Sequence, residues 1–123
     1  MPMKMPNFLS EDLVRRFKHA AMVAHFGYED ENIAMQRVGI DAVWQTVREL
    51  DAFGPDARSA LIPLLDDPDP GVCVFAARHL LDIRPDRALA AIKHIHNHCR
   101  TEARRTAAKF LEKYQNGELK ISG

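Results

Sequence analysis

The residues of this chain best suited to chemistry lie in one short run, residues 94–99 (HIHNHC). On a helix, His94 and His98 are four residues apart and share one face, the spacing at which two histidines can bind one metal ion. A complete site needs a further ligand from another helix, for which His79 and Asp82 are the candidates. Glutamate does not follow His94, so the two-histidine pattern of zinc proteases is missing.

The same run has a simpler interpretation. Histidines that lie near the C-terminal end of a surface helix are favoured there by the partial negative charge of the helix terminus. We adopt this interpretation, so the sequence predicts no metal and no cofactor, with His94 and His98 kept as an alternative. Cys99 beside histidines is the only thiol–imidazole candidate, and no serine-centred elbow or glycine-rich phosphate loop occurs. We therefore expect no enzyme activity.

A second run, residues 66–70 (DDPDP), holds three carboxylates. A calcium-binding loop of the helix–loop–helix type needs glycine at its sixth position and glutamate at its twelfth. Counted from Asp67, the twelfth residue is Arg78, so that pattern fails. The run is better interpreted as a tight bend between helices, with Asp69 as the N-cap and Pro70 at the first helical position.

The elements that position these residues follow from an internal repeat. Residues 85–114 echo residues 55–84, first at an offset of thirty and then at thirty-one. The matching pairs are Pro55-Asp56 with Pro85-Asp86, Ala60 with Ala90, Ile62 with Ile92, residues 76–78 with 107–109, and Leu80 with Leu111. Each copy is long enough for two helices and a bend, and such a period is typical of stacked helix pairs.

Strand signals are nearly absent, and apolar periodicity predicts an all-α chain of about six helices. The predicted helices span about 10–27, 30–53, 55–65, 70–83, 85–98 and 101–115. Ser10 is expected to cap the first helix and Gly27 to end it, whereas Pro63 should bend the third. The predicted stripe of the second helix includes Ile33, and Trp44, the only tryptophan, is expected to pack in the core.

A length of 123 residues favours a single domain. Its expected parts are an N-terminal helical cap (1–54), a first repeat (55–84), a second repeat (85–114) and a frayed tail (118–123).

Residues 71–80 (GVCVFAARHL) and 102–111 (EARRTAAKFL) resemble the second helices of HEAT-type repeats. The runs 12–17 (DLVRRF) and 54–66 (GPDARSALIPLLD) are similar to a family of short bacterial HEAT-like proteins of unknown function. The resemblance covers about residues 11–114 and implies a short right-handed α-α superhelix. Members of such families can lie beside toxin genes, which suggests by analogy an immunity or regulatory protein that neutralises a partner.

The second helices of the two repeats are expected to offer one shared docking face. Its predicted residues are Phe75, Arg78, His79 and Asp82 on the helix 70–83 and Thr106, Lys109 and Lys113 on the helix 101–115. An aromatic side chain among cations suits a partner peptide or an acidic protein surface. The sequence therefore predicts a non-enzymatic protein-interaction scaffold, the alternative being a solvated outer face with Phe75 half covered.

Seventeen basic and seventeen acidic residues cancel, so the overall charge does not favour nucleic acid or an anionic membrane. The last helix is locally positive, and nucleic-acid binding by it is kept as an alternative. Its cations are Arg100, Arg104, Arg105, Lys109 and Lys113.

The compartment is indicated by what the sequence lacks. Cys73 and Cys99 are expected to be buried free thiols, and no signal peptide or stretch of eighteen apolar residues occurs. We therefore expect a cytoplasmic protein. Self-association through the helix 10–27 or the helix 101–115 is a further hypothesis, because end helices of a short stack keep apolar flanks.

Overall fold

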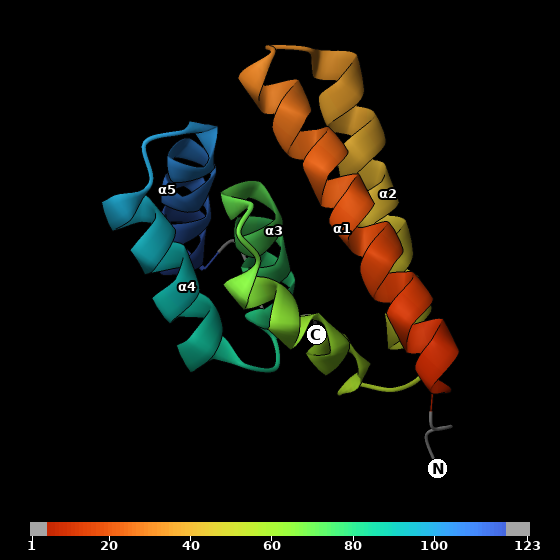
Figure 1. Cartoon of the computed structure of the whole chain (residues 1–123). Coiled ribbons are helices and arrows are strands. Elements are labelled where there is room, and N and C mark those ends of the chain that lie inside the picture. The colour runs from red at the N-terminus through yellow and green to blue at the C-terminus, as the bar shows by residue number, and fades with distance from the viewer. Residues whose placement is uncertain (1–4, 118–123) are drawn as a thin grey trace.

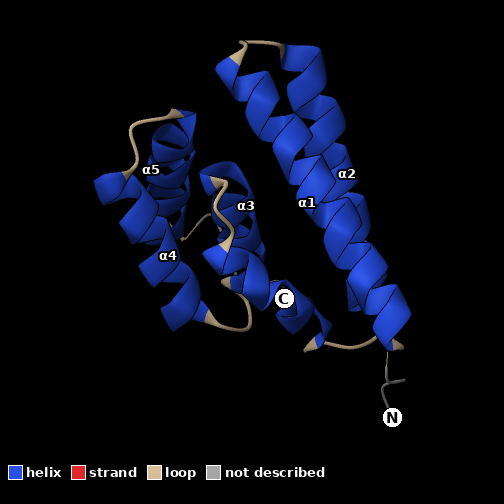
Figure 2. Ribbon diagram, in the orientation of Figure 1, coloured by secondary structure: helices blue, strands red, loops and turns tan. Residues whose placement is uncertain are grey.

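The computed structural model describes residues 5–117, and this part of the chain is built from helices, without strands (Figures 1 and 2). The elements are α1 (Asn7–Glu29), α2 (Ile33–Asp51), the 3₁₀-helix η1 (Ala57–Asp66), α3 (Pro70–Leu80), α4 (Pro85–His98) and α5 (Glu102–Gln115). The predicted all-α class and the six helices are confirmed. The expected frayed tail, residues 118–123, lies outside the described residues.

The helices form three layers (Figure 1). The long antiparallel hairpin of α1 and α2 makes one side, and the shorter pair α4 and α5 makes the other. Between them lies α3, which packs on η1, α1, α4 and α5. The outer layers also meet directly where α1 contacts α5.

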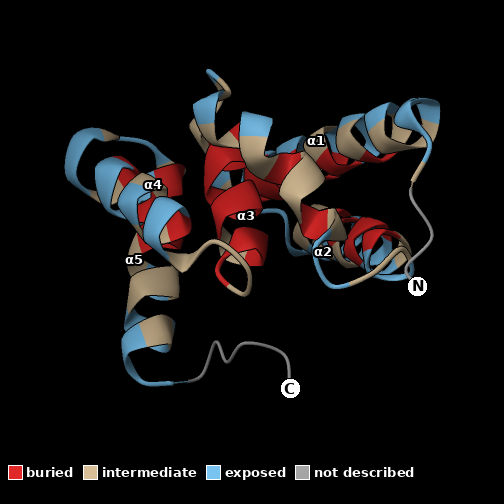
Figure 3. Ribbon diagram, turned by 90° about the horizontal axis from the view of Figure 1, so that it is seen from below, coloured by how far each residue is buried: buried red, intermediate tan, exposed pale blue. Residues whose placement is uncertain are grey.

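The central helix α3 is buried nearly all round (Figure 3). Nine of its eleven residues are buried, which is the pattern of a helix with neighbours on every side. The sequence predicted an apolar arc opposed by an exposed face containing Phe75 and His79, and this was wrong. Phe75 is 5% exposed and His79 is 2% exposed, because α1 and α5 cover the side that was assigned to solvent.

One continuous apolar cluster joins the three layers. Its largest fully buried side chains are Leu13, Phe17, Val43, Val47, Leu50, Leu61, Val72, Val74, Leu80, Leu81 and Ile92. Ile33, predicted to belong to this core, is instead 67% exposed at the start of α2.

The helices α3 and α5 begin with a side-chain cap, and the cap at Asp69 was predicted. The Asp69 carboxylate accepts a hydrogen bond from the Gly71 N–H at 2.8 Å, with Pro70 next in the chain. The Thr101 hydroxyl likewise accepts from the Ala103 N–H at 3.3 Å. Both side chains satisfy an N–H that has no partner within its own helix.

The limits of the first helix differ from the prediction. α1 begins at Asn7 rather than at Ser10, and it continues through Gly27 to Glu29. Gly27 is needed for close packing: a Cβ there would lie 2.6 Å from the backbone nitrogen of Gln36. Gly39 plays the same part on α2, where a Cβ would lie 2.3 Å from the backbone nitrogen of Ala24. These glycines let α1 and α2 approach closely.

The third predicted helix is a 3₁₀-helix, η1, rather than an α-helix. Pro63 lies inside it, and a proline lacks the N–H and crowds the carbonyl that an α-helix would use. With three residues per turn, residues three apart fall in line, and Arg58, Leu61 and Leu64 are its buried residues.

None of the helices within residues 5–117 combines the length and the hydropathy needed to cross a membrane.

Candidate functional site

The best candidate site is a hollow of about 250 Å³ between α1, α2, α3 and α5, called the central hollow below. Its lining residues are Tyr28, Ile40, Val43, Trp44, Phe75, Arg78, His79, Phe110 and Lys113. Segments distant in sequence meet in it, and it holds the only tryptophan of the chain. The hollow is large enough for one or two side chains of a partner.

Aromatic rings and one cation shape its walls. The guanidinium carbon of Arg78 lies 5.5 Å from the centroid of the Trp44 ring, within the range of a cation–π interaction. Phe75 and Phe110 meet edge to face, with ring centroids 6.0 Å apart. Burial lowers the pKa of Arg78 from its ordinary value, and the carboxylate of Asp82 opposes that shift. As an arginine, it stays charged at neutral pH.

His79 lies beneath Trp44 with almost no exposure. Its ring meets Trp44 edge to face at 4.6 Å between centroids, and Phe17 at 5.9 Å. Its Nδ1 atom has no hydrogen-bond partner among the described residues. Burial lowers the pKa of His79 well below its ordinary value, and the cations of Arg78 and Arg58 lower it further. The imidazole is therefore neutral at neutral pH.

The neutral state of His79 predicts a loss of stability in acid. Below the unfolded pKa of about 6.5, the unfolded chain takes up a proton that folded His79 does not bind. The free energy of unfolding should therefore fall as the pH drops from about 6.5 towards the lowered folded pKa. The contribution of His79 is up to about 1.4 kcal/mol for each pH unit.

Urea unfolding of the wild type and of His79→Leu, measured between pH 7.5 and 5, tests this expectation. In the variant, the free energy of unfolding should fall less steeply with decreasing pH. The difference should be up to about 1.4 kcal/mol per pH unit, the contribution of one proton. His96→Ala, which changes a less buried imidazole on α4, is the control for the loss of a histidine. Parallel curves for His79→Leu and wild type would contradict the buried neutral state.

The structure places only some of the predicted docking residues in the central hollow. Phe75, Arg78, His79 and Lys113 line the central hollow, but Phe75 and His79 do so as buried residues. Lys109 is exposed on α5 and is not part of the lining.

The two remaining docking residues are already engaged within the protein. Asp82 has a side chain that is only 10% exposed, and its carboxylate accepts from Arg58 Nη1 at 2.8 Å. Thr106 is 7% exposed, and its hydroxyl donates to the Glu102 carbonyl at 3.3 Å. The prediction of one exposed docking face was therefore wrong for Phe75, His79, Asp82 and Thr106.

Sequence reasoning missed Arg58, which is 6% exposed. Its Nε and Nη2 donate to the two carboxylate oxygens of Asp51, each at 2.9 Å, and its Nη1 donates to Asp82 and to the His79 carbonyl. The hydrogen bond with Asp51 is the largest cause of a raised Arg58 pKa. This cation therefore ties the end of α2 to η1 and α3. In the sequence, Arg58 precedes Leu61 by three residues. In a 3₁₀-helix this spacing puts both residues on one face, which could have indicated that Arg58 is buried.

The histidine run borders a different hollow, of about 380 Å³, between the 66–70 bend and the C-terminal half of α4. His94 and His98 share a face as predicted, with ring centroids 4.5 Å apart. The suggested further ligands were wrong, because His79 lies in the central hollow and Asp82 is bound to Arg58. Within residues 5–117, no three histidine, cysteine or acidic side chains are grouped to hold a metal ion.

Both cysteines are free, as predicted. The Cys73 thiol is buried and donates to the Leu65 carbonyl at 3.1 Å. Burial, with smaller contributions from the carboxylates of Asp66 and Asp67, raises the pKa of Cys73 to about 11. Cys73 is therefore a poor nucleophile at neutral pH. Cys99 is only partly buried.

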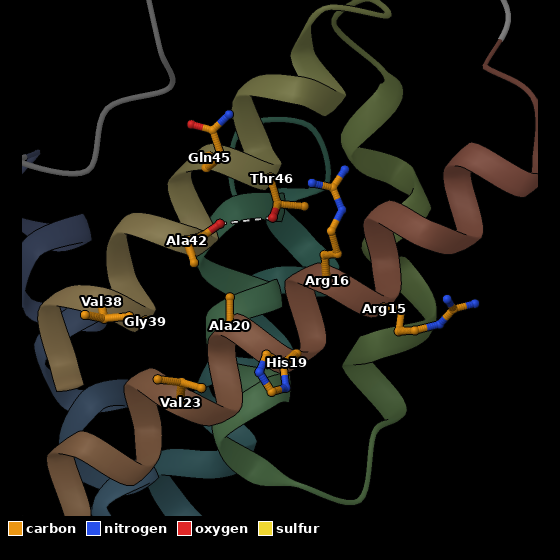
Figure 4. Close-up of a pocket in the computed structure, with 10 residues that line it drawn as sticks. All are labelled: Arg15, Arg16, His19, Ala20, Val23, Val38, Gly39, Ala42, Gln45 and Thr46. Atoms are coloured by element: carbon orange, nitrogen blue, oxygen red, sulfur yellow. Dashed lines mark hydrogen bonds between the residues drawn. The ribbon is translucent and has the colours of Figure 1, made fainter.

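A larger groove of about 520 Å³ runs between α1 and α2 (Figure 4). Its lining is Arg15, Arg16, His19, Ala20, Val23, Val38, Gly39, Ala42, Gln45 and Thr46. Some of its polar groups are already engaged: the Thr46 hydroxyl donates to the Ala42 carbonyl, and Arg16 donates to Glu49 at 3.0 and 3.2 Å. This outer groove is therefore mainly apolar and presents little chemistry that would select a ligand.

The cations predicted to bind nucleic acid are exposed on α5 and just before it. They are Arg100, Arg104, Arg105, Lys109 and Lys113. One of them, Arg105, forms an ion pair with Glu102 at 3.3 Å. Nucleic-acid binding stays a prediction.

Comparisons of this chain with protein-family models, with curated proteins and with solved structures found no match. The HEAT-like resemblance therefore stays an expectation, and function has to be argued from the site.

Proposed function

We propose that this protein is a non-enzymatic protein-interaction module and that the central hollow is its binding site. The observation that supports the proposal is the meeting of Trp44, Tyr28 and Arg78 in one hollow, with Arg78 held over Trp44. Tryptophan, tyrosine and arginine are the residues most enriched among the energetic centres of protein interfaces. Rigid aromatic walls also cost little entropy when a partner binds.

The proposal includes the HEAT-like architecture, a short right-handed stack of helix pairs. Its support is the match between the repeated segments and the helix pairs: residues 55–84 hold η1 and α3, and residues 85–114 hold α4 and nearly all of α5. In the proposed stack, the hairpin of α1 and α2 serves as the N-terminal cap. In this arrangement α3 and α5, the second helices, supply five of the nine residues that line the hollow.

A cytoplasmic location belongs to the same proposal, because the free thiols of Cys73 and Cys99 suit a reducing compartment. A protein that neutralises one partner would be a special case of this function.

Selection from a phage-displayed library of random dodecapeptides tests the proposal. Selected peptides should change the fluorescence of Trp44, which reports on the hollow alone because the chain has no other tryptophan. Two variants of α2 form a matched pair for anisotropy measurements with fluorescein-labelled peptides. Ile40→Trp fills the central hollow and should weaken binding at least tenfold, whereas Val38→Trp lies in the outer groove and should leave binding unchanged.

A library that yields no binding peptides would overturn the proposal. So would peptides that bind without affecting Trp44, or peptides that Val38→Trp weakens and Ile40→Trp does not. The second pattern would assign binding to the outer groove.

A further inference from the structure

The central hollow carries two cations, and within the described part of the chain neither Arg78 nor Lys113 has a carboxylate at ion-pair distance. Asp82 attracts Arg78 from beyond that distance, but its carboxylate is hydrogen-bonded to Arg58, as is the carboxylate of Asp51. Among residues 5–117, no carboxylate therefore pairs directly with the cations of the hollow.

We propose that the central hollow receives an acidic side chain, glutamate or aspartate, that a partner protein presents next to an aromatic or aliphatic residue. This inference rests on the proposed function and names the chemistry of its partner. Cations on two walls of the hollow, Arg78 from α3 and Lys113 from the last turn of α5, are complementary to the carboxylate. The rings of Trp44 and Phe110 are complementary to the neighbouring apolar group.

Arg78 is prepared for this role before any partner binds. Its position over Trp44 restricts the long side chain, so less entropy is lost when the guanidinium pairs with a carboxylate. A planar guanidinium can donate two parallel hydrogen bonds to the two oxygens of one carboxylate. The same partial burial that lowers the pKa of Arg78 also strengthens its attraction for an anion.

The buried imidazole of His79 also lines the hollow. The side chain is 98% buried and leaves Nδ1 without a partner among the described residues. Nδ1 is enclosed by protein atoms, so the contribution of His79 to the hollow is the shape and the neutral charge of its ring. The charged groups around it are Arg78 on α3 and Arg58 on η1, both cationic. This surrounding favours an anion over a cation in the hollow.

The hollow suits a side-chain carboxylate better than the phosphates of a nucleic acid. Phosphate backbones are bound by several cations spread over a surface, and their affinity comes from many such contacts. Here two cations border a space of about 250 Å³ with aromatic walls. One acidic side chain and a neighbouring apolar group match that size and composition.

The test compares two synthetic peptides of identical length, each acetylated at its N-terminus and amidated at its C-terminus. One has the sequence Gly-Ser-Gly-Glu-Phe-Glu-Gly-Ser-Gly, and in the other both glutamates are replaced by glutamine. Titration in 50 mM NaCl, followed by Trp44 fluorescence, should give at least tenfold tighter binding for the glutamate peptide. Raising the salt to 500 mM should reduce that advantage, because screening weakens charge pairing.

Two exposed lysines provide matched variants. Lys113→Glu places a negative charge at the hollow. It should weaken binding of the glutamate peptide at least tenfold and should weaken binding of the glutamine peptide less. Lys93→Glu makes the same charge change on α4, outside the hollow, and should bind both peptides as the wild type does. Arg78→Gln should also weaken binding of the glutamate peptide.

Equal binding of the two peptides would overturn the inference and leave the proposed function standing. Failure of both peptides, when the dodecapeptide library has yielded binders at Trp44, would do the same. A twelve-residue oligo-dT that displaces the glutamate peptide and binds more tightly would also overturn the inference, in favour of nucleic acid. Failure of the library itself is the separate result that removes the proposed function.

Discussion

Replacing Arg58 with alanine should lower the free energy of unfolding by about 3–5 kcal/mol. Four hydrogen bonds are lost, and the carboxylate of Asp82, with a side chain only 10% exposed, is left without its cation. An uncompensated buried charge costs more than the ion pair itself contributes. Urea unfolding at pH 7 gives the free energy, and the melting temperature should fall by about 10 °C or more.

The expected loss comes from burial rather than from ion pairing as such, and two controls separate these causes. Arg16→Ala also removes an arginine that donates two hydrogen bonds to a carboxylate, that of Glu49, but its side chain is 44% exposed. It should cost less than about 1 kcal/mol. The double variant Arg58→Met with Asp82→Leu should recover part of the loss because no buried charge remains. A similar cost for Arg58→Ala and Arg16→Ala would contradict the buried network.

Replacing Phe75 with alanine should cost about 3–5 kcal/mol, the usual range for a buried phenylalanine. The side chain is 5% exposed and meets Phe110 edge to face across the contact between α3 and α5. Its removal leaves a cavity and loses the aromatic pair that joins these helices. Thermal and urea unfolding measure the effect, and Phe75→Leu should retain most of the stability because it keeps much of the volume.

Phe8→Ala is the matched control, since Phe8 is 76% exposed on α1 and should change stability by no more than about 0.5 kcal/mol. A cost within about 1 kcal/mol for Phe75→Ala would mean that Phe75 is exposed, as the sequence predicted. The buried wall of the central hollow would then be wrong.

The sequence by itself determined the local structure of this protein. Within residues 5–117, the absence of strands, the number of helices and the capping by Asp69 depend on residues only a few positions apart, so each could be predicted from its own segment. The start of α4 at Pro85 is of the same kind. Three local predictions failed. Ser10 was expected to cap α1, but the helix begins at Asn7. Pro63 was expected to bend an α-helix, but the whole segment is a 3₁₀-helix, and Gly27 lies inside α1 because it permits contact with α2.

Tertiary structure alone decided which residues form the candidate site. Apolar periodicity assumes one buried face for each helix, but α3 has neighbours on every side, so its supposed outer residues Phe75 and His79 are buried. The pairing of Arg58 with Asp51 and Asp82 joins positions up to 24 residues apart. Trp44 and Lys113 likewise reach the central hollow from α2 and α5. Whether a residue is buried and whether its charge is paired depend on every element packed around it. The sequence pattern along one helix indicates only which faces of that helix are apolar.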